Sequence, residues 1–382
     1  MSAPAMVNAR HLNPRAVYDQ LLDHDALTRD QLSHLTGLTR VAASASVEHL
    51  VERGLALAAD RSAGRGGPAA RRYSLTPTAG YVVGADITHG NVTVAAADLT
   101  GRVAATIRRP FEDPDDAAAV LSQAVASCLR EADAEPARLR RVVLGSPGVI
   151  DPGTGEFAFA NILPTWKTTV TAELRRQLRR PVVFENDVNL AAMAEARFGR
   201  GRGVPHLVFA WFGGGIGLGL VLNGRLYRGR KGWAGEIGYL PAPMPKAHVE
   251  VEGMPRSLHQ LASAVAISAL AEAHGLDADP SVAVVAAAQA GAAGEAFLRE
   301  VARRVAMVTS AAALLVDPSV LVLSGGYVTA GGEPLLARVR DEMARISPTP
   351  APIALAAVHD DPILRGALQT ALDDARDALF NG

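Results

Sequence analysis

The stretch Phe184-Glu185-Asn186-Asp187-Val188-Asn189 carries two carboxylates and two carboxamides. It lies between residues 181–183, which are typical of a β-strand, and residues 190–197, whose alanines favour a helix. Ligands of α/β proteins bind beyond the carboxyl ends of strands. Asn and Asp side chains there can hydrogen-bond a polyol, and Asp187 could act as a general base. A helix N-cap would explain one of these residues but not four. A ligand site and an elaborate cap therefore both remain open.

Length and composition are those of a soluble globular protein. The 382 residues suffice for two or three domains, with 49% hydrophobic and 20% charged residues. A formal net charge of −1 means that any nucleic-acid binding must come from a local patch. The single cysteine, Cys128, excludes a disulfide framework and a cysteine-rich zinc site. Residues 1–15 lack the apolar core of a signal peptide, and no apolar run reaches 18 residues. We expect a cytoplasmic protein without a membrane partner.

The N-terminal residues predict a helix-turn-helix. Helices are expected over 15–22, from Thr28 onward, and from Thr39 to Gly54, with Gln31 at the capping-box position after Thr28. Gly37 breaks the chain between the second and third helices. Helix, short glycine-containing turn and helix is the DNA-binding pattern, although any αα-hairpin would share it.

The segment that follows favours DNA binding. Residues 55–57 and 73–75 predict two strands, and residues 61–72 between them contain four arginines and no acid. A β-hairpin with a basic tip beside a helix-turn-helix is a wing, and its arginines suit phosphate contacts. We therefore predict a winged helix-turn-helix domain over residues 1–78.

Beyond residue 79 the pattern of three strands followed by α/β units occurs twice. We predict an α/β fold of two like lobes, residues 79–198 and 199–382, facing each other across a cleft, with the last helix packing back on the first lobe. Strands are expected at 81–86, 92–98, 102–108, 139–144, 207–212, 216–222, 225–227, 320–323 and 352–356, and helices at 115–131, 169–178, 258–273, 281–288, 294–315, 333–346 and 362–379.

Several glycine-rich motifs, in their order and spacing, resemble the ROK family of repressors and sugar kinases. The resemblance implies an actin-like ATPase (ribonuclease H-like) module from Tyr81 onward, and the repressor branch of the family also carries an N-terminal winged helix. The matching motifs are Gly84-Ala85-Asp86, Gly145-Ser146-Pro147-Gly148-Val149, Glu185-Asn186-Asp187-Val188-Asn189, Gly213-Gly214-Gly215-Ile216-Gly217-Leu218-Gly219, Ala234-Gly235-Glu236-Ile237-Gly238 and Ser324-Gly325-Gly326.

Departures from the family pattern bear on catalysis. The kinases of the family carry Asp-x-Gly-Gly-Thr-Lys in the first hairpin. In this chain Thr88 and His89 replace both glycines of that motif, and in the second hairpin Gly214 takes the place of the kinases' threonine. A side chain at those glycines keeps the backbone away from a phosphate. The cysteine cluster that holds zinc in the family is absent, and two histidines, His248 and His259, cannot replace three thiolates. We expect neither a cofactor nor a metal.

The resemblance also implies a ligand pocket. The family's hexose contacts match Asn186, Asp187 and Glu236, while two further contacts become Tyr239 and His259. We add Gly148 to this set. We expect a carbohydrate-like or other polar small molecule, and the alternative is that these groups are buried hydrogen-bonding residues of a cleft that binds nothing.

At the DNA end, the expected recognition helix reads Thr39-Arg40-Val41-Ala42-Ala43-Ser44-Ala45. Its alanines allow close approach in the major groove but supply few base hydrogen bonds, so Arg40 is the main expected contact. The complete set of expected DNA contacts is Arg29, Thr39, Arg40, Ser44, Arg65, Arg71 and Arg72.

Three functions follow from these features. The first is a transcriptional regulator, by resemblance a repressor, whose operator binding is controlled by a sugar-like effector between the lobes. The second is an ATP-dependent, glucokinase-like sugar kinase with Asp187 as base. The third is a DNA-binding dimer without a ligand. Paired half-sites lead us to expect a homodimer or homotetramer.

Overall fold

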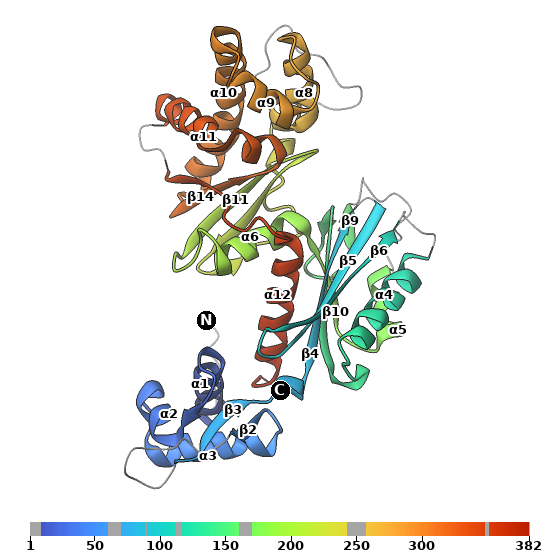
Figure 1. The fold of residues 1–382 in the computed structure, drawn as a ribbon, viewed down its shortest axis with the longest axis vertical. Helices are drawn as coiled ribbons and strands as arrows, with labels where there is room; N and C mark the ends of the chain where they lie inside the picture. Colours follow the sequence, from blue (N-terminus) through green and yellow to red (C-terminus); the bar gives the residue numbers. More distant parts are fainter. Residues whose placement is uncertain are drawn as a thin grey trace.

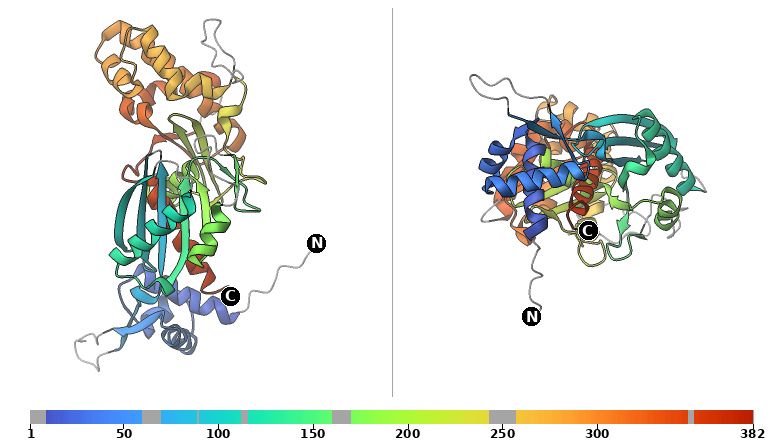
Figure 2. Two further views of the ribbon diagram at one scale, coloured as in Figure 1. Left: turned by 90° about the vertical axis from the view of Figure 1, so that its right-hand side faces the viewer. Right: turned by 90° about the horizontal axis from the view of Figure 1, so that it is seen from below.

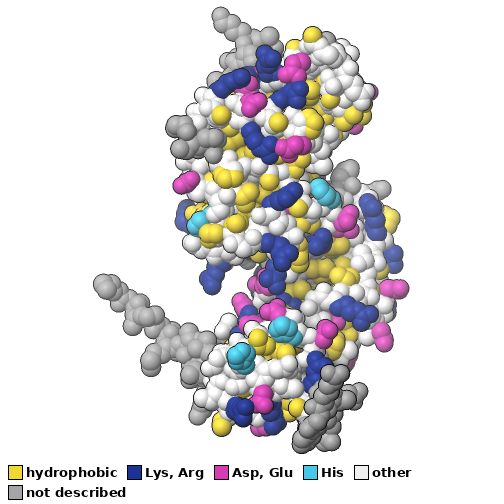
Figure 3. All heavy atoms as spheres, turned by 60° about the vertical axis from the view of Figure 1, so that its left-hand side comes forward, with side chains coloured by type: hydrophobic (Ala, Val, Ile, Leu, Met, Phe, Trp, Pro, Cys, Tyr) yellow, Lys and Arg dark blue, Asp and Glu magenta, His cyan; other side chains and the backbone are white. Residues whose placement is uncertain are grey.

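The computed structural model describes residues 9–59, 70–88, 90–111, 116–159, 170–242, 257–347 and 351–381. Figure 1 shows three parts along one long axis: an N-terminal helical domain, a first α/β lobe and a second α/β lobe. Figure 2 shows that the N-terminal domain lies at one end of this elongated molecule. Positive and negative side chains are intermingled over the face in Figure 3, in keeping with the near-zero net charge.

The N-terminal domain is a helix-turn-helix with a hairpin beside it. Its elements are α1 (Ala9–Asp23), β1 (Leu27–Thr28), α2 (Arg29–Thr36), α3 (Arg40–Glu52), β2 (Ala56–Ala59) and β3 (Arg72–Leu75), with the strands in the order β1-β3-β2. The predicted capping box is present, because the Thr28 hydroxyl accepts from the Gln31 amide and the Gln31 side chain accepts from Thr28. Gly37 has a φ of 70° after α2, where a side chain would be strained. The tip of the predicted wing lies outside the described residues.

Two five-stranded sheets with the same topology form the rest of the molecule. The first contains β4 (Tyr81–Thr88), β5 (Gly90–Asp98), β6 (Val103–Phe111), β7 (Leu139–Ser146) and β10 (Val182–Asn186); the second contains β11 (His206–Phe212), β12 (Ile216–Leu222), β13 (Arg225–Leu226), β14 (Val320–Ser324) and β15 (Ile353–Leu355). In each sheet an antiparallel meander of three strands is extended, beside its first strand, by two parallel strands. The predicted duplication of topology is confirmed.

The two lobes contain further helices and a small hairpin. In the first lobe they are α4 (Ala117–Glu131), a small hairpin of β8 (Val149–Ile150) and β9 (Phe157–Phe159), and α5 (Val170–Leu178); in the second they are α7 (Leu258–Ala262), α8 (Ala264–Ala273), α9 (Pro280–Ala287), α10 (Gly291–Val316) and α11 (Gly326–Ile346). The expected helix over 258–273 is divided at Ser263, whose side chain accepts from the Ala266 amide and so begins a new helix. The helix expected from residue 333 begins earlier and is kinked at Gly332, which has a φ of 58°.

Two helices lie between the sheets. Helix α6 (Asp187–Phe198) contacts β11 and β12 of the second sheet, and α12 (Pro362–Ala378) contacts β4 and β7 of the first. The two helices also contact each other. Figure 1 shows α12 passing between the lobes and ending beside the N-terminal domain. The last helix of the chain therefore packs on the first lobe, although it follows the second in sequence.

The end of the chain is part of the N-terminal core. Phe380 packs in one hydrophobic cluster with residues of α1, α2 and α3 and is 5% exposed. Its ring meets Tyr18 edge to face at 5.5 Å. Arg15 donates to Asp377 at 2.7 Å, and Arg53 donates to the Leu379 carbonyl at 2.7 Å. Helix α12 thereby joins the lobes to the helix-turn-helix. Among the described residues, no helix is long and apolar enough to cross a membrane.

Candidate functional site

Asn186 and Asp187 lie at the predicted junction, where β10 ends and α6 begins. Asn186 is the N-cap of α6, since its side-chain oxygen accepts from the Asn189 amide at 3.1 Å. Its side-chain nitrogen donates to the Gly148 carbonyl at 3.1 Å, which ties α6 to the loop between β7 and β8. Capping of α6 therefore explains the asparagine at position 186, as the cap interpretation expected. It does not explain the aspartate at position 187.

Glu185 braces this junction from inside. It is 3% exposed, and its carboxylate accepts from the Asn189 side chain at 2.8 Å and from Arg228 at 2.5 Å. A buried carboxylate is stable when it is paired and hydrogen-bonded in this way. Glu185 and Arg228 also line a hollow of about 310 Å³, together with Arg175, Val183 and residues 152–155. Glu185 thus holds the orientation of Asn186 and Asn189.

Four carboxylates converge beside the junction. Burial, followed by the charges of Asp187 and Asp361, raises the pKa of Asp86 to about 7. Burial also raises the pKa of Asp187, and burial with the charge of Asp187 raises the pKa of Glu236. One buried oxygen of Asp86 has no hydrogen-bond partner among the described residues. A carboxyl group accepts hydrogen bonds when it is ionised and also donates one when it is protonated, so this cluster suits a ligand that carries several hydroxyl groups.

We expect Asp86→Asn to reduce the pH dependence of stability. The pKa of Asp86 in the folded state lies above the value of about 3.9 that an unfolded chain has. The folded protein therefore binds this proton more tightly, and its stability falls as the pH rises from about 4 to about 7. Asparagine removes the penalty, so the variant should be more stable than wild type at pH 8. Urea unfolding at pH 5 and pH 8 measures this, and an unchanged difference between the two pH values would contradict it.

Tyr239 and His259 extend the site toward the second lobe. Tyr239 is half exposed, and burial with the charge of Glu236 raises the pKa of its hydroxyl. The His259 side chain lies against Gly215 and Gly238, close to where their Cβ atoms would be, and burial lowers the pKa of its imidazole. Burial therefore favours the neutral imidazole, which is one donor and one acceptor. The positions expected for a ligand thus come together from both lobes.

The two hairpins that carry phosphate-binding glycines in the family's kinases have their own internal hydrogen bonds here. The Thr88 hydroxyl donates to the Asn91 carbonyl across the β4–β5 turn, at 3.2 Å. In the β11–β12 turn, the Gly213 amide donates to the Gly215 carbonyl at 3.0 Å, and a Cβ at Gly214 would meet nothing within 4 Å. His89 lies outside the described residues. The Thr88 hydroxyl is therefore directed at its own backbone.

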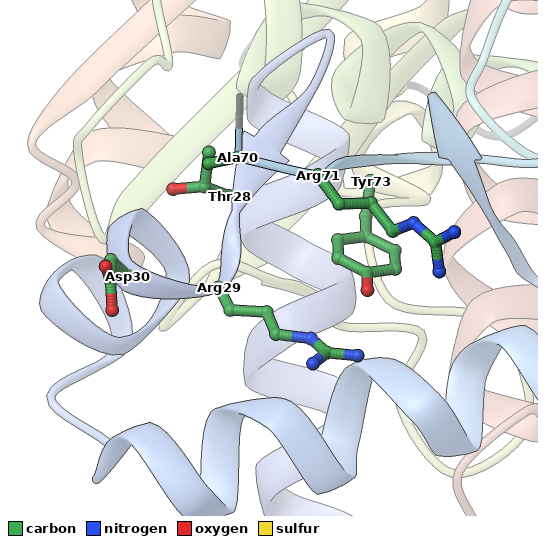
Figure 4. Close-up of a pocket in the computed structure, with 6 residues that line it drawn as sticks. All are labelled: Thr28, Arg29, Asp30, Ala70, Arg71 and Tyr73. Atoms are coloured by element: carbon green, nitrogen blue, oxygen red, sulfur yellow. The ribbon is translucent and has the colours of Figure 1, made fainter. Parts of the chain in front are cut away.

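A hollow of about 450 Å³ lies between α2 and the base of the wing (Figure 4). It is lined by Thr28, Arg29, Asp30, Arg71 and Tyr73, with Ala70 beside them. Arg29 lies 5.4 Å from the centre of the Tyr73 ring and donates to Glu48 at 3.0 Å. Arginines beside the first turn of a helix are suited to a phosphate, because the free amides and the helix dipole add to their charge.

Other expected DNA contacts differ in their surroundings. Thr39 is the N-cap of α3, and Ser44 is half-buried. Arg40 is 82% exposed and pairs with Asp30 at 3.1 Å, an exchangeable surface contact. The Arg72 guanidinium donates to the Ala26 carbonyl, with Nε at 3.2 Å, and so holds the base of the wing, while its expected contact with DNA stays a prediction. Arg65 lies outside the described residues.

Some residues of the site could not be found from the sequence pattern alone. Asp361 precedes α12 and lies 174 positions after Asp187, and Arg228 lies in a loop after β13. Their roles depend on contacts between segments far apart in the chain. Asp86 is the last residue of the motif Gly84-Ala85-Asp86. The sequence signal for its role is that a two-lobed fold places it opposite an aspartate at the end of a strand. No group of three or more His, Cys, Asp or Glu side chains in the described ranges is arranged to hold a metal.

Comparison with known proteins gives sequence relatives and solved structures. The xylose repressor of Bacillus subtilis (strain 168) is 24% identical over 234 residues, 60% of this chain and 60% of the relative. The DNA-binding transcriptional dual regulator NagC of Escherichia coli (strain K12) is 24% identical over 254 residues, 65% of this chain and 60% of the relative. The matched segments thus span about 60% of the length of these curated relatives.

Two solved structures cover more of the fold. The ROK hexokinase from Thermus thermophilus is 28% identical, with a TM-score of 0.67, over 78% of this chain and 99% of the other. A ROK family transcriptional regulator, described as a homolog of the E. coli MLC protein, has a TM-score of 0.78 over 98% of this chain and all of the other. At 19% identity this second likeness is one of fold. The ROK family model matches residues 82–373, about three quarters of the sequence. The chain therefore belongs to the ROK family.

Proposed function

We propose that this protein is a transcriptional regulator whose operator binding is controlled by a sugar-like effector held between the two lobes. The observation that carries the proposal is the path of α12 from the candidate ligand site to the helix-turn-helix. At one end, the charge of Asp361 acts on Asp86; at the other, Phe380 lies in the N-terminal core. A helix of 17 residues spans about 26 Å, so one rigid element connects the two sites.

Helix α12 also contacts two of the elements that carry the candidate ligand site. It packs against β4, which carries Asp86, and against α6, which begins with Asp187. Leu190 of α6 and Leu368 of α12 share one hydrophobic cluster with residues of the first sheet. A ligand that binds one arrangement of the lobes better than another would therefore bias the position of α12. Because packed elements shift as units, that bias reaches the DNA-binding domain.

The effector we propose is a carbohydrate or a close derivative. The names of the relatives, a xylose repressor and a regulator related to N-acetylglucosamine, support this class. The chemistry agrees with them, because Asp86, Asp187 and Glu236 offer carboxylate oxygens to hydroxyl groups. Asn186, Asp187, Glu236, Tyr239 and His259, with the Gly148 carbonyl nearby, are the groups we propose to contact it.

The DNA half of the proposal rests on the winged helix-turn-helix. The exposed start of α3 presents Thr39 and Arg40, and Arg29 and Arg71 line the hollow beside it. We propose that α3 enters the major groove and that the two hollow-lining arginines contact phosphate. Operators with paired half-sites require an even number of subunits, so we propose a homodimer or homotetramer. By analogy with the named repressors, the ligand releases the operator.

We propose that the protein does not transfer phosphate. Thr88 and His89 occupy positions where the family's kinases have glycine, and the Thr88 hydroxyl is bound to its own hairpin. Asp187 keeps the place of a general base, but a base without a bound phosphate donor performs no phosphoryl transfer. Titration with ATP tests this directly, and binding at micromolar concentration would restore the kinase interpretation.

We expect Asp187→Ala to abolish the sugar response and to leave operator binding intact. The variant loses a carboxylate acceptor in the proposed pocket, which should weaken sugar binding by about 1.5–3 kcal/mol, or roughly 10- to 150-fold. The DNA-binding surface lies in another domain. Gel-shift titrations with and without the sugar measure both quantities, and Asp341→Ala, on the exposed face of α11, is the matched control. An unaltered sugar response would contradict the assigned pocket.

A further inference from the structure

Three aromatic side chains cluster on the surface beside the candidate ligand site. Phe159, Trp233 and Tyr239 are 38%, 44% and 53% exposed. Their ring centroids are 5.9 Å apart for Phe159 and Trp233, 5.8 Å for Trp233 and Tyr239, and 6.5 Å for Phe159 and Tyr239. These rings come from three segments: the end of β9, the loop after β13, and the short 3₁₀ turn Ile237–Tyr239. We call them the aromatic trio.

The aromatic trio is continuous with the ligand site. Phe159 pairs in the β8–β9 hairpin with Val149, the residue after Gly148, whose carbonyl accepts from Asn186. On the opposite side, the charge of Glu236 acts on the Tyr239 hydroxyl. The aromatic trio therefore lies directly beside the polar groups that we propose to contact the sugar.

The backbone places Trp233 in the aromatic trio. Gly232 before it has a φ of 83°, and a Cβ there would lie 2.1 Å from the Ile150 carbonyl oxygen. Only glycine allows this close approach, which lays the loop against the β8–β9 hairpin. Lys231 donates to Asp151 at 2.7 Å and anchors the same loop to the same hairpin. Trp233 is thus held beside Phe159 by contacts on both of its N-terminal neighbours.

A cluster of exposed aromatic rings indicates a binding surface. Single exposed apolar residues are common on soluble proteins, whereas contiguous apolar patches usually mark a site of interaction. A carbohydrate ring presents a polar edge to hydrogen-bonding groups and an apolar C–H face that packs on an aromatic ring, which is large, flat and rigid. The polar site beside the trio supplies carboxylates for the edge of one ring. The aromatic trio supplies an apolar surface on which the face of a second sugar ring can pack.

We propose that the aromatic trio is a subsite for a second ring, so that the effector is a disaccharide or a glycoside and not a free monosaccharide. One sugar residue occupies the site of Asn186, Asp187 and Glu236, and the ring attached to it stacks on Trp233 with Tyr239 and Phe159 at its sides. This inference deepens the proposed function and rests on it, because it assumes that the polar site holds a sugar.

The test compares sugars in matched pairs by calorimetry on the full chain: D-xylose with xylobiose, N-acetylglucosamine with N,N′-diacetylchitobiose, and D-glucose with cellobiose. For one pair we expect the disaccharide to bind about tenfold or more tightly than its monosaccharide. Trp233→Ala should remove that gain and leave the affinity for the monosaccharide unchanged. Trp233→Phe, which keeps an aromatic face, should restore most of it.

Other results would overturn the inference in distinguishable ways. Equal affinities within the pair that binds, or a gain that survives Trp233→Ala, would show that the trio is not a sugar subsite while the sugar site itself stands. A change of oligomeric state in Trp233→Ala, with sugar affinities unaltered, would identify the trio as a contact between copies of the chain. Binding of none of the six sugars would overturn the proposed sugar site and this inference together.

Discussion

Replacing Phe380 with alanine should destabilise the N-terminal domain by about 3–5 kcal/mol, the usual cost of truncating a buried phenylalanine. The ring is 5% exposed and packs edge to face on Tyr18. The guanidinium groups of Arg15 and Arg53 lie 5.6 Å and 5.7 Å from its centre, so the variant also loses two cation–π contacts. Urea unfolding and amide hydrogen exchange in α1 and α3 measure the effect.

The matched control for this variant is Phe198→Ala. The Phe198 ring is 41% exposed and lies against Arg365, so its removal should cost no more than about 1 kcal/mol. Phe380→Ala should also weaken the effect of a sugar on operator binding, because it loosens the joint between α12 and the helix-turn-helix. A variant with wild-type stability and a full sugar response would show that the end of the chain does not couple the two domains.

Glu195→Ala should cost a similar amount, about 3–5 kcal/mol, for a different reason. Glu195 lies on α6 and is fully buried. One of its oxygens accepts from the Ala357 amide at 2.7 Å and the Val358 amide at 2.6 Å, and the other accepts from the Arg200 amide at 2.9 Å. These contacts join α6 to the segment that leads into α12. The alanine variant leaves three backbone donors without their acceptor.

Chemical denaturation of three variants separates this role from a general effect of removing charge. Glu195→Gln keeps one accepting oxygen, so it should fall between wild type and Glu195→Ala. Glu131→Ala, at the exposed end of α4, removes the same side chain from the surface and should stay within about 0.5 kcal/mol of wild type. Equal stabilities of Glu195→Ala and Glu131→Ala would refute the assigned role.

The sequence was sufficient to predict the architecture, because the features that determine the architecture lie close together in the sequence. Alternating strands, turns at glycine and a capping box at Thr28 are read within a few residues of one another. The two sheets followed from the repeated order of three strands and α/β units. The position of Asn186 and Asp187 also followed, since a strand-to-helix junction places them at a sheet edge. Even the break at Ser263 had a local signal, a serine able to begin a helix.

The contacts that connect the parts could not be predicted in this way. Phe380 enters the core of a domain that lies more than 300 positions earlier in the chain, and nothing in Leu379-Phe380 indicates that partner. The basic segment around Arg72 does not indicate that its guanidinium donates to the Ala26 carbonyl. The aromatic trio combines one ring from each of three segments. Such features depend on tertiary packing, which the periodicity and spacing of residues in the sequence do not predict.

The most direct test of the proposed function is the affinity of the 382-residue protein for its operator with and without sugar. The operator is first selected from genomic DNA fragments, and its dissociation constant is then measured at fixed salt, because phosphate contacts make this affinity depend on salt. We predict specific binding that the effector sugar weakens by tenfold or more, with the response lost in Asp187→Ala. Specific binding that none of the six sugars alters, or no specific site at all, would contradict the account.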